Sequence, residues 1–461
     1  MVEYSLLFYY FLGSDYLKTQ HYLESKKYST LVFIACFIAY AASYVGRINY
    51  SAALPDILEE GLFTKSQAGI IGSAFFIVYG FFQIINGFLG DKISPFKMII
   101  LGTFLSAGAN TVMTFCTTNV SMAIVWGFNG FALSLLWAAI LKILANIINY
   151  DMRSKACLNI SATLPIGTVL AYILASVSIN FFNWKYVFYT STVVLLFSGV
   201  FFTATYIISK KHIKEVEITT PLNNNKKSEQ TKNAGKFLPL FLSAGLLLVL
   251  PADAIHGAIK EGITTWVPTM ITETYNTPVA FSVFVSIILP IVNLSGNYIV
   301  TPLYNKVFKK DELKTGAAIL SFVLIPFTFL IFMKNLPVVV SVILLALGTT
   351  AMYTFNYMII TLVPMQFAKY GKTATVTGVM NATAYIGCAA ATYGFGIISD
   401  NIGWNGTVIV WIVIDIIALL FTTLNIKKWN RFKNNECLWF RQHNLRWRKC
   451  LSFIQIFSKK R

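Results

Sequence analysis

Two basic residues lie deep within long apolar stretches of the chain. Arg47 follows IACFIAYAASYVG, and Lys260 lies shortly before GITTWVP. An ionisable side chain inside a membrane span costs several kcal/mol, so each one is a candidate for a functional site. A guanidinium offers a planar set of donors that matches phosphate or carboxylate oxygens, and it keeps its charge. The two cations therefore predict a site for a small anion, with a side chain reaching water at the outer helix end as the alternative for Arg47.

The neighbours of Lys260 leave a second alternative open. Glu261 is adjacent, and Asp253 stands seven residues earlier, roughly on the same helical face. A structural ion pair from Lys260 to either carboxylate would account for the lysine without a ligand. His256, four residues before Lys260 on that face, is either a hydrogen-bonding partner or a titrating group.

Other polar side chains within apolar stretches give weaker signals. Lys142, in WAAILKILANII, is either a site residue or, as is common near a helix end, a side chain that extends to the membrane surface. We expect Asp415 to be a packing group rather than a proton carrier. Spacing alone does not separate binding from packing for the tyrosines within these stretches, Tyr40, Tyr44, Tyr79 and Tyr385.

The composition is that of a polytopic membrane protein. Hydrophobic residues make up 56% and charged residues 12% of the 461 residues, and the mean hydropathy is +0.64. A soluble chain carries about a quarter charged residues, so these values argue against a cytosolic enzyme. Apolar residues come in blocks of about 20, the length that crosses a hydrocarbon core. No nucleophile–base pair or metal-ligand set is visible, and we expect neither enzymatic activity nor a cofactor.

The net charge of +18 does not indicate nucleic-acid binding. Most of it lies in residues 210–236 and 427–461, next to apolar stretches. Basic segments beside membrane spans are typical of cytoplasmic loops that face anionic lipid. The cysteines show no paired spacing that would indicate a metal site or a disulfide framework; they are Cys36, Cys116, Cys157, Cys388, Cys437 and Cys450.

Apolar blocks between polar residues predict an all-α membrane protein with twelve transmembrane helices. An even number places both termini on one side, and the distribution of acidic and basic loops predicts that this side is cytoplasmic. The predicted helices are 30–54, 66–90, 97–116, 119–148, 155–180, 184–209, 238–268, 278–301, 313–333, 336–364, 373–398 and 404–426.

The chain divides into two sets of six helices. The bundles are 30–209 and 238–426, joined by a cytoplasmic linker at 210–237, which PLNNNKKSEQTKN predicts to be flexible. A cytoplasmic segment precedes them at 1–29. The basic tail at 427–461 is either an amphipathic helix on the inner membrane surface or unstructured.

The two sets of helices resemble copies of one unit. Arg47 and Pro55 recur as Lys260 and Pro268, 213 positions later, and Gly167 and Trp184 recur as Gly387 and Trp404, 220 positions later. A duplicated six-helix unit is the architecture in which a substrate binds between the halves near the middle of the bilayer.

GFLGDKISPFK lies between the second and third predicted helices. Gly87, Gly90, Asp91 and Lys92 predict a tight turn with a charge network at a cytoplasmic helix end, with a partner near Arg153. Such a network concerns conformational locking and not substrate chemistry.

GFLGDKISPFK resembles the signature loop of the major facilitator superfamily. YVGRINYSAALP, KEGITTWVPT and TGVMNATAYIGCAAATYGFGIISDNIGWNG resemble the organophosphate:phosphate antiporter family within it, over residues 30–428. The resemblance implies two pseudo-symmetric bundles, alternating access, and exchange of an organic phosphate for inorganic phosphate. Arg47 and Lys260 match its phosphate-binding positions; Tyr40, Tyr44, Tyr79 and Tyr385 match tyrosines of its cavity, and Trp137 and Lys142 a Trp and a basic position.

Three departures disfavour glycerol 3-phosphate and favour a hexose phosphate or a related compound. Gln83 and Leu164 stand where the glycerol-3-phosphate members have a lysine and a histidine, and Ile48 replaces a second base. We expect a monomeric antiporter of the cell membrane whose empty form reorients slowly, because it holds two unneutralised cations. The alternatives are a sugar-phosphate sensor of the same family, or a proton-coupled carrier that uses Asp253, Glu261 or Asp415.

Overall fold

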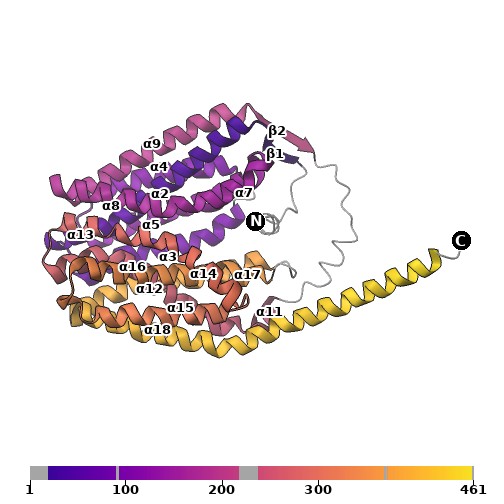
Figure 1. Cartoon of the computed structure of the whole chain (residues 1–461). Helices are drawn as coiled ribbons and strands as arrows, with labels where there is room; N and C mark the ends of the chain where they lie inside the picture. Colours follow the sequence, from indigo (N-terminus) through magenta and orange to yellow (C-terminus); the bar gives the residue numbers. More distant parts are fainter. Residues whose placement is uncertain (1–18, 90–92, 218–236, 368–369, 371, 459–461) are drawn as a thin grey trace.

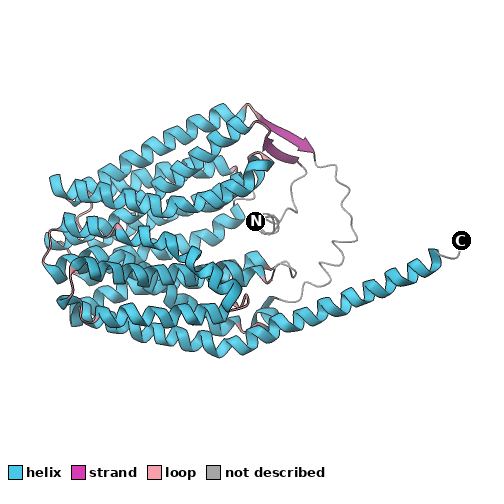
Figure 2. Ribbon diagram, in the orientation of Figure 1, coloured by secondary structure: helices cyan, strands magenta, loops and turns pink. Residues whose placement is uncertain are grey.

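Long helices make up nearly all of the protein that the structure describes. The computed structural model describes residues 19–89, 93–217, 237–367, 370 and 372–458 (Figure 1). Figure 2 shows the helices running side by side. Large apolar side chains cover the outside of the bundle; Phe115, Phe181 and Leu424 are each at least 70% exposed. Such a surface is stable in lipid and not in water.

The N-terminal half comprises helices α2 to α9, which lie together in Figure 1. Short π and 3-10 turns interrupt the fourth and fifth predicted spans. The elements are α2 (Lys26–Glu59), α3 (Lys65–Leu89), α4 (Pro95–Met113), α5 (Asn119–Ser134), α6 (Leu136–Lys142), η1 (Ile143–Ile147), α7 (Tyr150–Asn159), η2 (Ile160–Ala162), α8 (Thr163–Phe181) and α9 (Trp184–Lys210).

The C-terminal half comprises α11 to α18 and lies alongside the first (Figure 1). The elements are α11 (Phe237–Ser243), α12 (Leu246–Tyr275), α13 (Val279–Val285), α14 (Ile288–Pro302), η3 (Leu303–Val307), α15 (Glu312–Leu330), η4 (Met333–Asn335), α16 (Val338–Asn356), η5 (Tyr357–Leu362), α17 (Val363–Met365) and α18 (Thr373–Ser458).

Ten helical stretches in the described part of the chain are long and apolar enough to cross a membrane. The predicted count is twelve. Two predicted helices lie in the single stretch Thr375–Lys433, where the non-helical backbone of Gly403 separates them within α18. The seventh predicted helix corresponds to α12, which is absent from the ten and carries Asp253, Lys260 and Glu261. Its ionisable residues lower its apolarity, as expected of a helix that serves a site.

A two-stranded antiparallel sheet adds to the predicted all-α fold. Strand β1 (Thr19–Leu23) pairs with β2 (Ile213–Glu217), so the segment before α2 and the segment after α9 are joined (Figure 2). The predicted flexible linker at 210–237 thus contains a strand, and the predicted segment 1–29 contains another. Residues 218–236, with most of PLNNNKKSEQTKN, lie outside the described residues.

Helix α18 continues beyond the predicted end of the last span. It is helical to Ser458 and extends well past the other helices in Figure 1. Its first turns beyond the span are anchored by Glu312 at the start of α15, which accepts hydrogen bonds from Trp429 Nε1 at 2.9 Å and Lys433 Nζ at 2.7 Å. The basic tail is therefore a direct continuation of α18, which differs from the unstructured alternative. Its place on the inner membrane surface stays a prediction.

Corresponding contacts recur in the two halves. A Cβ atom at Gly167 would lie 2.5 Å from the carbonyl oxygen of Ala41, and one at Gly387 would clash with that of Ala254. Small residues at such positions let two membrane helices approach closely. A second pair involves tryptophans: Trp184 Nε1 donates to Glu60 at 2.9 Å, and Trp404 Nε1 donates to Glu273 at 2.8 Å. All of these partners are related by the offsets of 213 and 220 seen in the sequence.

The halves are joined at the distal end, by which we mean the end where α2 gives way to α3 and α12 to α13. Lys65 Nζ on α3 lies 2.9 Å from Glu273 Oε2 and 3.9 Å from Asp400 Oδ1, both in the other half. The backbone N–H of Ser66 also donates to Asp400 at 2.9 Å. These contacts favour a closed distal end.

Lys65→Ala should loosen this closure. An exposed ion-pair network is worth up to ~1 kcal/mol, so we expect the population open at the distal end to rise about fivefold. The measure is the rate at which a water-soluble maleimide labels Thr265→Cys, a position buried between the halves. Lys185→Ala, which removes another lysine at the distal end, should leave that rate unchanged. Equal labelling rates in both variants would contradict the role of Lys65 in closing the distal end.

Candidate anion-binding site

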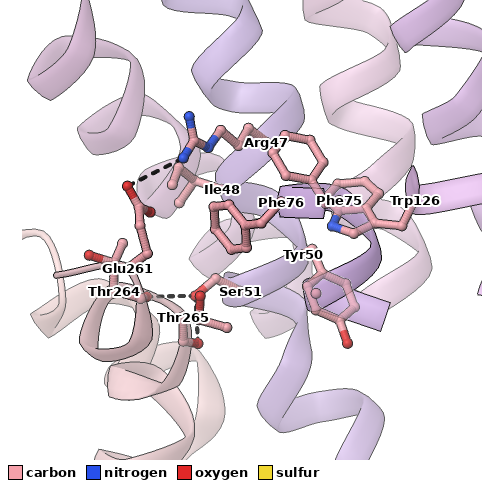
Figure 3. A pocket seen from close by; sticks show the side chains of 11 residues that line it. Arg47, Ile48, Tyr50, Ser51, Phe75, Phe76, Trp126, Glu261, Thr264 and Thr265 are labelled. Atoms are coloured by element: carbon pink, nitrogen blue, oxygen red, sulfur yellow. Dashed lines mark hydrogen bonds and ion pairs between the residues drawn. The ribbon is translucent and has the colours of Figure 1, made fainter. Parts of the chain in front are cut away.

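Arg47 and Lys260 meet at one carboxylate between the two halves. Arg47 Nη2 lies 3.3 Å from Glu261 Oε1 (Figure 3). Lys260 Nζ lies 3.2 Å from the same oxygen. The three side chains are 8–14% exposed. Arg47 therefore faces the interior and does not reach toward water at a helix end.

Figure 3 shows a small pocket beside this cluster. Its free space is about 20 Å³, enough for about one water molecule. A phosphorylated compound requires more room, so the pocket must widen to admit one. The lining residues come from α2, α3, α5 and α12 and are Arg47, Ile48, Tyr50, Ser51, Gly72, Phe75, Phe76, Trp126, Glu261, Thr264 and Thr265.

Aromatic rings surround the two cations. The guanidinium carbon of Arg47 lies 5.4–5.6 Å from the centroids of four rings, those of Tyr44, Phe75, Phe76 and Tyr79. Lys260 Nζ lies 5.0 Å from the ring centroid of Tyr353. Ring faces attract a cation, and apolar surroundings strengthen its attraction for an anion. The two cations thus lie in a largely buried, aromatic environment.

Buried amides fix the turn of α2 that carries Arg47. The carbonyl of Gly46 accepts hydrogen bonds from Asn129 Nδ2 at 2.8 Å and from Asn110 Nδ2 at 3.5 Å. Asn49 Nδ2 donates to Asn110 Oδ1 at 2.6 Å. Satisfied amide networks in an apolar interior are rigid, so α2 is held at one rotation. Arg47 is thereby presented to α12.

One turn beyond Arg47, α2 and α12 touch directly. Ser51 Oγ lies 2.7 Å from the carbonyl oxygens of both Thr264 and Thr265 (Figure 3). Ser51 and Thr264 are 213 positions apart, as are Arg47 and Lys260. Equivalent residues of the two halves thus contact each other at Ser51 and Thr264. Arg47 and Lys260, one turn away, therefore lie on either side of this contact.

Two of the four predicted tyrosines contact Arg47, and the other two contact those tyrosines. Tyr44 and Tyr79 contact its guanidinium, whereas Tyr40 stacks on Trp137 at 4.8 Å and contacts the edge of Tyr44 at 5.5 Å. The ring of Tyr385 lies 5.2 Å from that of Tyr79. Tyr40 and Tyr385 therefore support the rings next to Arg47.

Lys260, His256 and Lys142 are not among the residues that line the pocket, and Lys260 reaches the pocket through Glu261. His256 is fully buried, with Nδ1 3.2 Å from Asp253 Oδ1 and Nε2 3.0 Å from Asn356 Nδ2. Its contacts are thus with side chains of the protein. Lys142 is the last residue of α6 and is not among the residues that line the pocket.

The predicted charge network after α3 is described only in part. Gly87 lies in the last turn of α3, and Gly90, Asp91 and Lys92 lie outside the described residues. Arg153 is buried and donates from Nε to the carbonyl of Ile148 at 3.0 Å and from Nη2 to that of Asn146 at 2.9 Å. Arg153 thus holds the backbone between η1 and α7.

The predicted alternative of an ion pair from Lys260 to Glu261 is present, but the sequence analysis missed that Arg47 shares this carboxylate. It also missed the rings of Phe75, Phe76 and Tyr353. Glu261 had a signal, because its carboxylate is adjacent to Lys260 and lies within an apolar stretch. The rings had none, because aromatic residues are frequent in every span. The expectation of two unneutralised cations differs from the structure, in which Glu261 neutralises one charge of the pair.

Comparison with known proteins agrees with this architecture. Residues 36–392 match the family described as Major Facilitator Superfamily. The chain belongs to the Major Facilitator Superfamily. It is a multi-pass membrane protein with the all-helical fold of this transporter family. Solved structures share that fold. One is a bacterial homologue of the human lysosomal transporter Spinster in an inward-facing and unoccupied conformation, with a TM-score of 0.73 at 12% identity. The match covers 88% of this chain and 99% of that one.

Sequence similarity to known transporters confirms the resemblance to the organophosphate:phosphate antiporter family. The chain is 24% identical over 428 residues to the glycerol-3-phosphate transporter of Bacillus subtilis, covering 89% of this chain and 94% of the relative. It is 23% identical to a probable hexose phosphate transport protein of Chlamydia trachomatis, over 38% of this chain and 39% of that protein. It is also 28% identical to the membrane sensor protein UhpC of Salmonella typhimurium, over 22% of this chain and 23% of the sensor.

Proposed function

We propose that this protein exchanges a phosphorylated organic compound for inorganic phosphate across the cell membrane. The observation that carries the proposal is that Arg47 and Lys260, from different halves, contact one carboxylate oxygen at 3.3 and 3.2 Å. A phosphoryl oxygen in that position would accept from both cations. Charge-assisted contacts of this kind are the strong contacts of phosphate sites.

Alternating access would follow from the position of the site. A ligand held by Arg47 on α2 and by Lys260 on α12 links the halves, which then rock about it. The recurring contacts of Gly167 and Gly387 support a duplicated unit with twelve spans. Loop charges support cytoplasmic termini, with anionic lipid as the partner of the basic tail. We propose that the carrier works as a monomer, because one chain supplies both cations of the site.

The organic part of the substrate is set by the walls of the site. Gln83, whose Nε2 donates to Tyr79 at 3.3 Å, is neutral where glycerol-3-phosphate members place a lysine. With one cation fewer, we propose a hexose phosphate or a related sugar phosphate as the substrate.

A substrate panel tests the proposal. Purified protein is reconstituted into liposomes loaded with labelled phosphate, and glucose 6-phosphate, glycerol 3-phosphate or glucose is added outside. We expect glucose 6-phosphate to raise phosphate efflux by about tenfold or more over glucose, the factor that ~1.4 kcal/mol of recognition provides. Efflux that no phosphorylated compound stimulates would refute exchange, and binding without transport would favour the sensor, as in UhpC.

A proton-coupled carrier is the second candidate, and the position of Glu261 favours it. A carboxylate that leaves two cations when a ligand arrives is a natural proton acceptor. Uptake that collapses with a protonophore and persists without internal phosphate would support this candidate over exchange.

A further inference from the structure

Glu261 occupies the position that a ligand oxygen would take. Its Oε1 atom lies 3.3 Å from Arg47 Nη2 and 3.2 Å from Lys260 Nζ, and its side chain is 8% exposed. Beside it, free space amounts to about 20 Å³. A phosphoryl group is much larger than one water molecule. It therefore reaches both cations only when the carboxylate moves away from them.

The two contacts of Glu261 differ in what they join. Glu261 and Lys260 are neighbours on α12, so their contact lies within one half. Arg47 belongs to α2, so its contact with Glu261 bridges the halves. A bound phosphate would likewise contact Lys260 on α12 and Arg47 on α2. Glu261 can thus take the place of phosphate when the site is empty.

The replacement of phosphate by Glu261 matters because of the net charge of the site. Without Glu261 the site would hold two buried cations, and each unpaired buried charge costs several kcal/mol. With Glu261 in place the cluster carries one net positive charge. The conformations through which the empty carrier must pass are then less unfavourable, since the halves remain linked by an ion pair.

We propose that Glu261 is a tethered counter-anion, which the transported anion displaces and which returns to Arg47 and Lys260 when the site empties. This inference rests on the proposed function. It adds that the empty carrier reorients, so that net movement of phosphate accompanies exchange. Glu261 then sets the balance between the two modes and lowers the affinity for phosphate.

Glu261→Gln tests the proposal, because glutamine keeps the size of the side chain and removes its charge. Liposomes loaded with labelled phosphate are diluted into buffer with phosphate, which measures exchange, or without it, which measures net efflux. We expect the ratio of exchange to net efflux to rise about tenfold in the variant, and the Kd for inorganic phosphate to fall about tenfold, in line with buried charge-pair couplings of ~1.5 kcal/mol or more.

Two further variants keep the result interpretable. Asp415→Asn removes another buried intramembrane carboxylate, on α18 and outside the pocket lining, and should leave ratio and Kd at wild-type values. Glu261→Asp keeps the charge on a side chain one methylene shorter, which cannot span both cations equally, and should give an intermediate ratio. If Glu261→Gln does not transport, phosphate binding is read from its thermal stability, and phosphate should raise its Tm more than it raises the wild-type Tm.

The outcomes separate this inference from the proposed function. A wild-type protein that neither binds nor exchanges phosphate refutes the proposed function. Wild-type exchange together with an unchanged ratio and Kd in Glu261→Gln overturns the tethered counter-anion alone. An equal change in Asp415→Asn would also overturn it, because the effect would then be general to buried carboxylates.

Discussion

Arg47→Ala should abolish transport of phosphate and of organic phosphates while leaving the protein inserted in the membrane. The variant removes one of the two cations that would hold the anion and leaves Glu261 paired with Lys260 alone. Truncating one partner of a buried charge pair costs about 3–5 kcal/mol, which corresponds to a loss of at least about 100-fold in affinity. The measurement is phosphate exchange in liposomes, with the inserted amount determined separately.

The control for Arg47→Ala is Arg431→Ala, which removes an exposed arginine of α18. It should retain wild-type exchange. Arg47→Lys should recover only a small part of the activity, because an ammonium cannot offer the two parallel N–H donors of a guanidinium. Exchange by Arg47→Ala at the wild-type rate would remove Arg47 from the site.

Gly387→Ala should prevent stable packing of the C-terminal half. A methyl group there would clash with the carbonyl oxygen of Ala254, and backbone atoms on both helices must shift to make room. Overpacking of this kind costs about 3 kcal/mol or more, so we expect the apparent Tm to fall by ~5 °C or more, with loss of folded protein during purification. Thermal unfolding in detergent measures this effect.

The matched control is Gly394→Ala, seven residues later on the same helix. A Cβ atom at Gly394 meets nothing within 4 Å, and alanine favours helix more than glycine does. The Tm of Gly394→Ala should equal or exceed that of the wild type. Equal Tm values for the two variants would show that α12 and α18 do not approach as closely as the structure has them.

Most of the helices were predictable because lipid imposes a simple rule. Backbone groups in a membrane must be bonded within their own segment, so an apolar block of sufficient length has to be helical. The bounds of α2 and α9 lie within a few residues of the prediction for this reason. Strand β2 and the helical tail lie outside the apolar blocks, where this rule does not apply. The strand was not predicted, and the sequence left the tail open between an amphipathic helix and an unstructured segment.

The residues of the candidate site were predictable only as charges. Arg47 and Lys260 stand out because ionisable residues are rare in spans, and their common offset pairs them. His256 satisfied the same criterion, yet it contacts Asp253 and Asn356, whereas Lys260 contacts Glu261 at the pocket. Rarity shows that a polar residue has a partner, and it does not show whether that partner is a ligand or another side chain.

The sequence by itself determined the apolar helices, the internal repeat and the two intramembrane cations, because each depends on composition and spacing along one segment. Only the tertiary structure decided that Arg47 and Lys260 share the carboxylate of Glu261 and that aromatic rings enclose them. The rotation of α2 against α12 fixes both features. That rotation depends on amide networks and close glycine contacts between segments far apart in the chain, which no local pattern records.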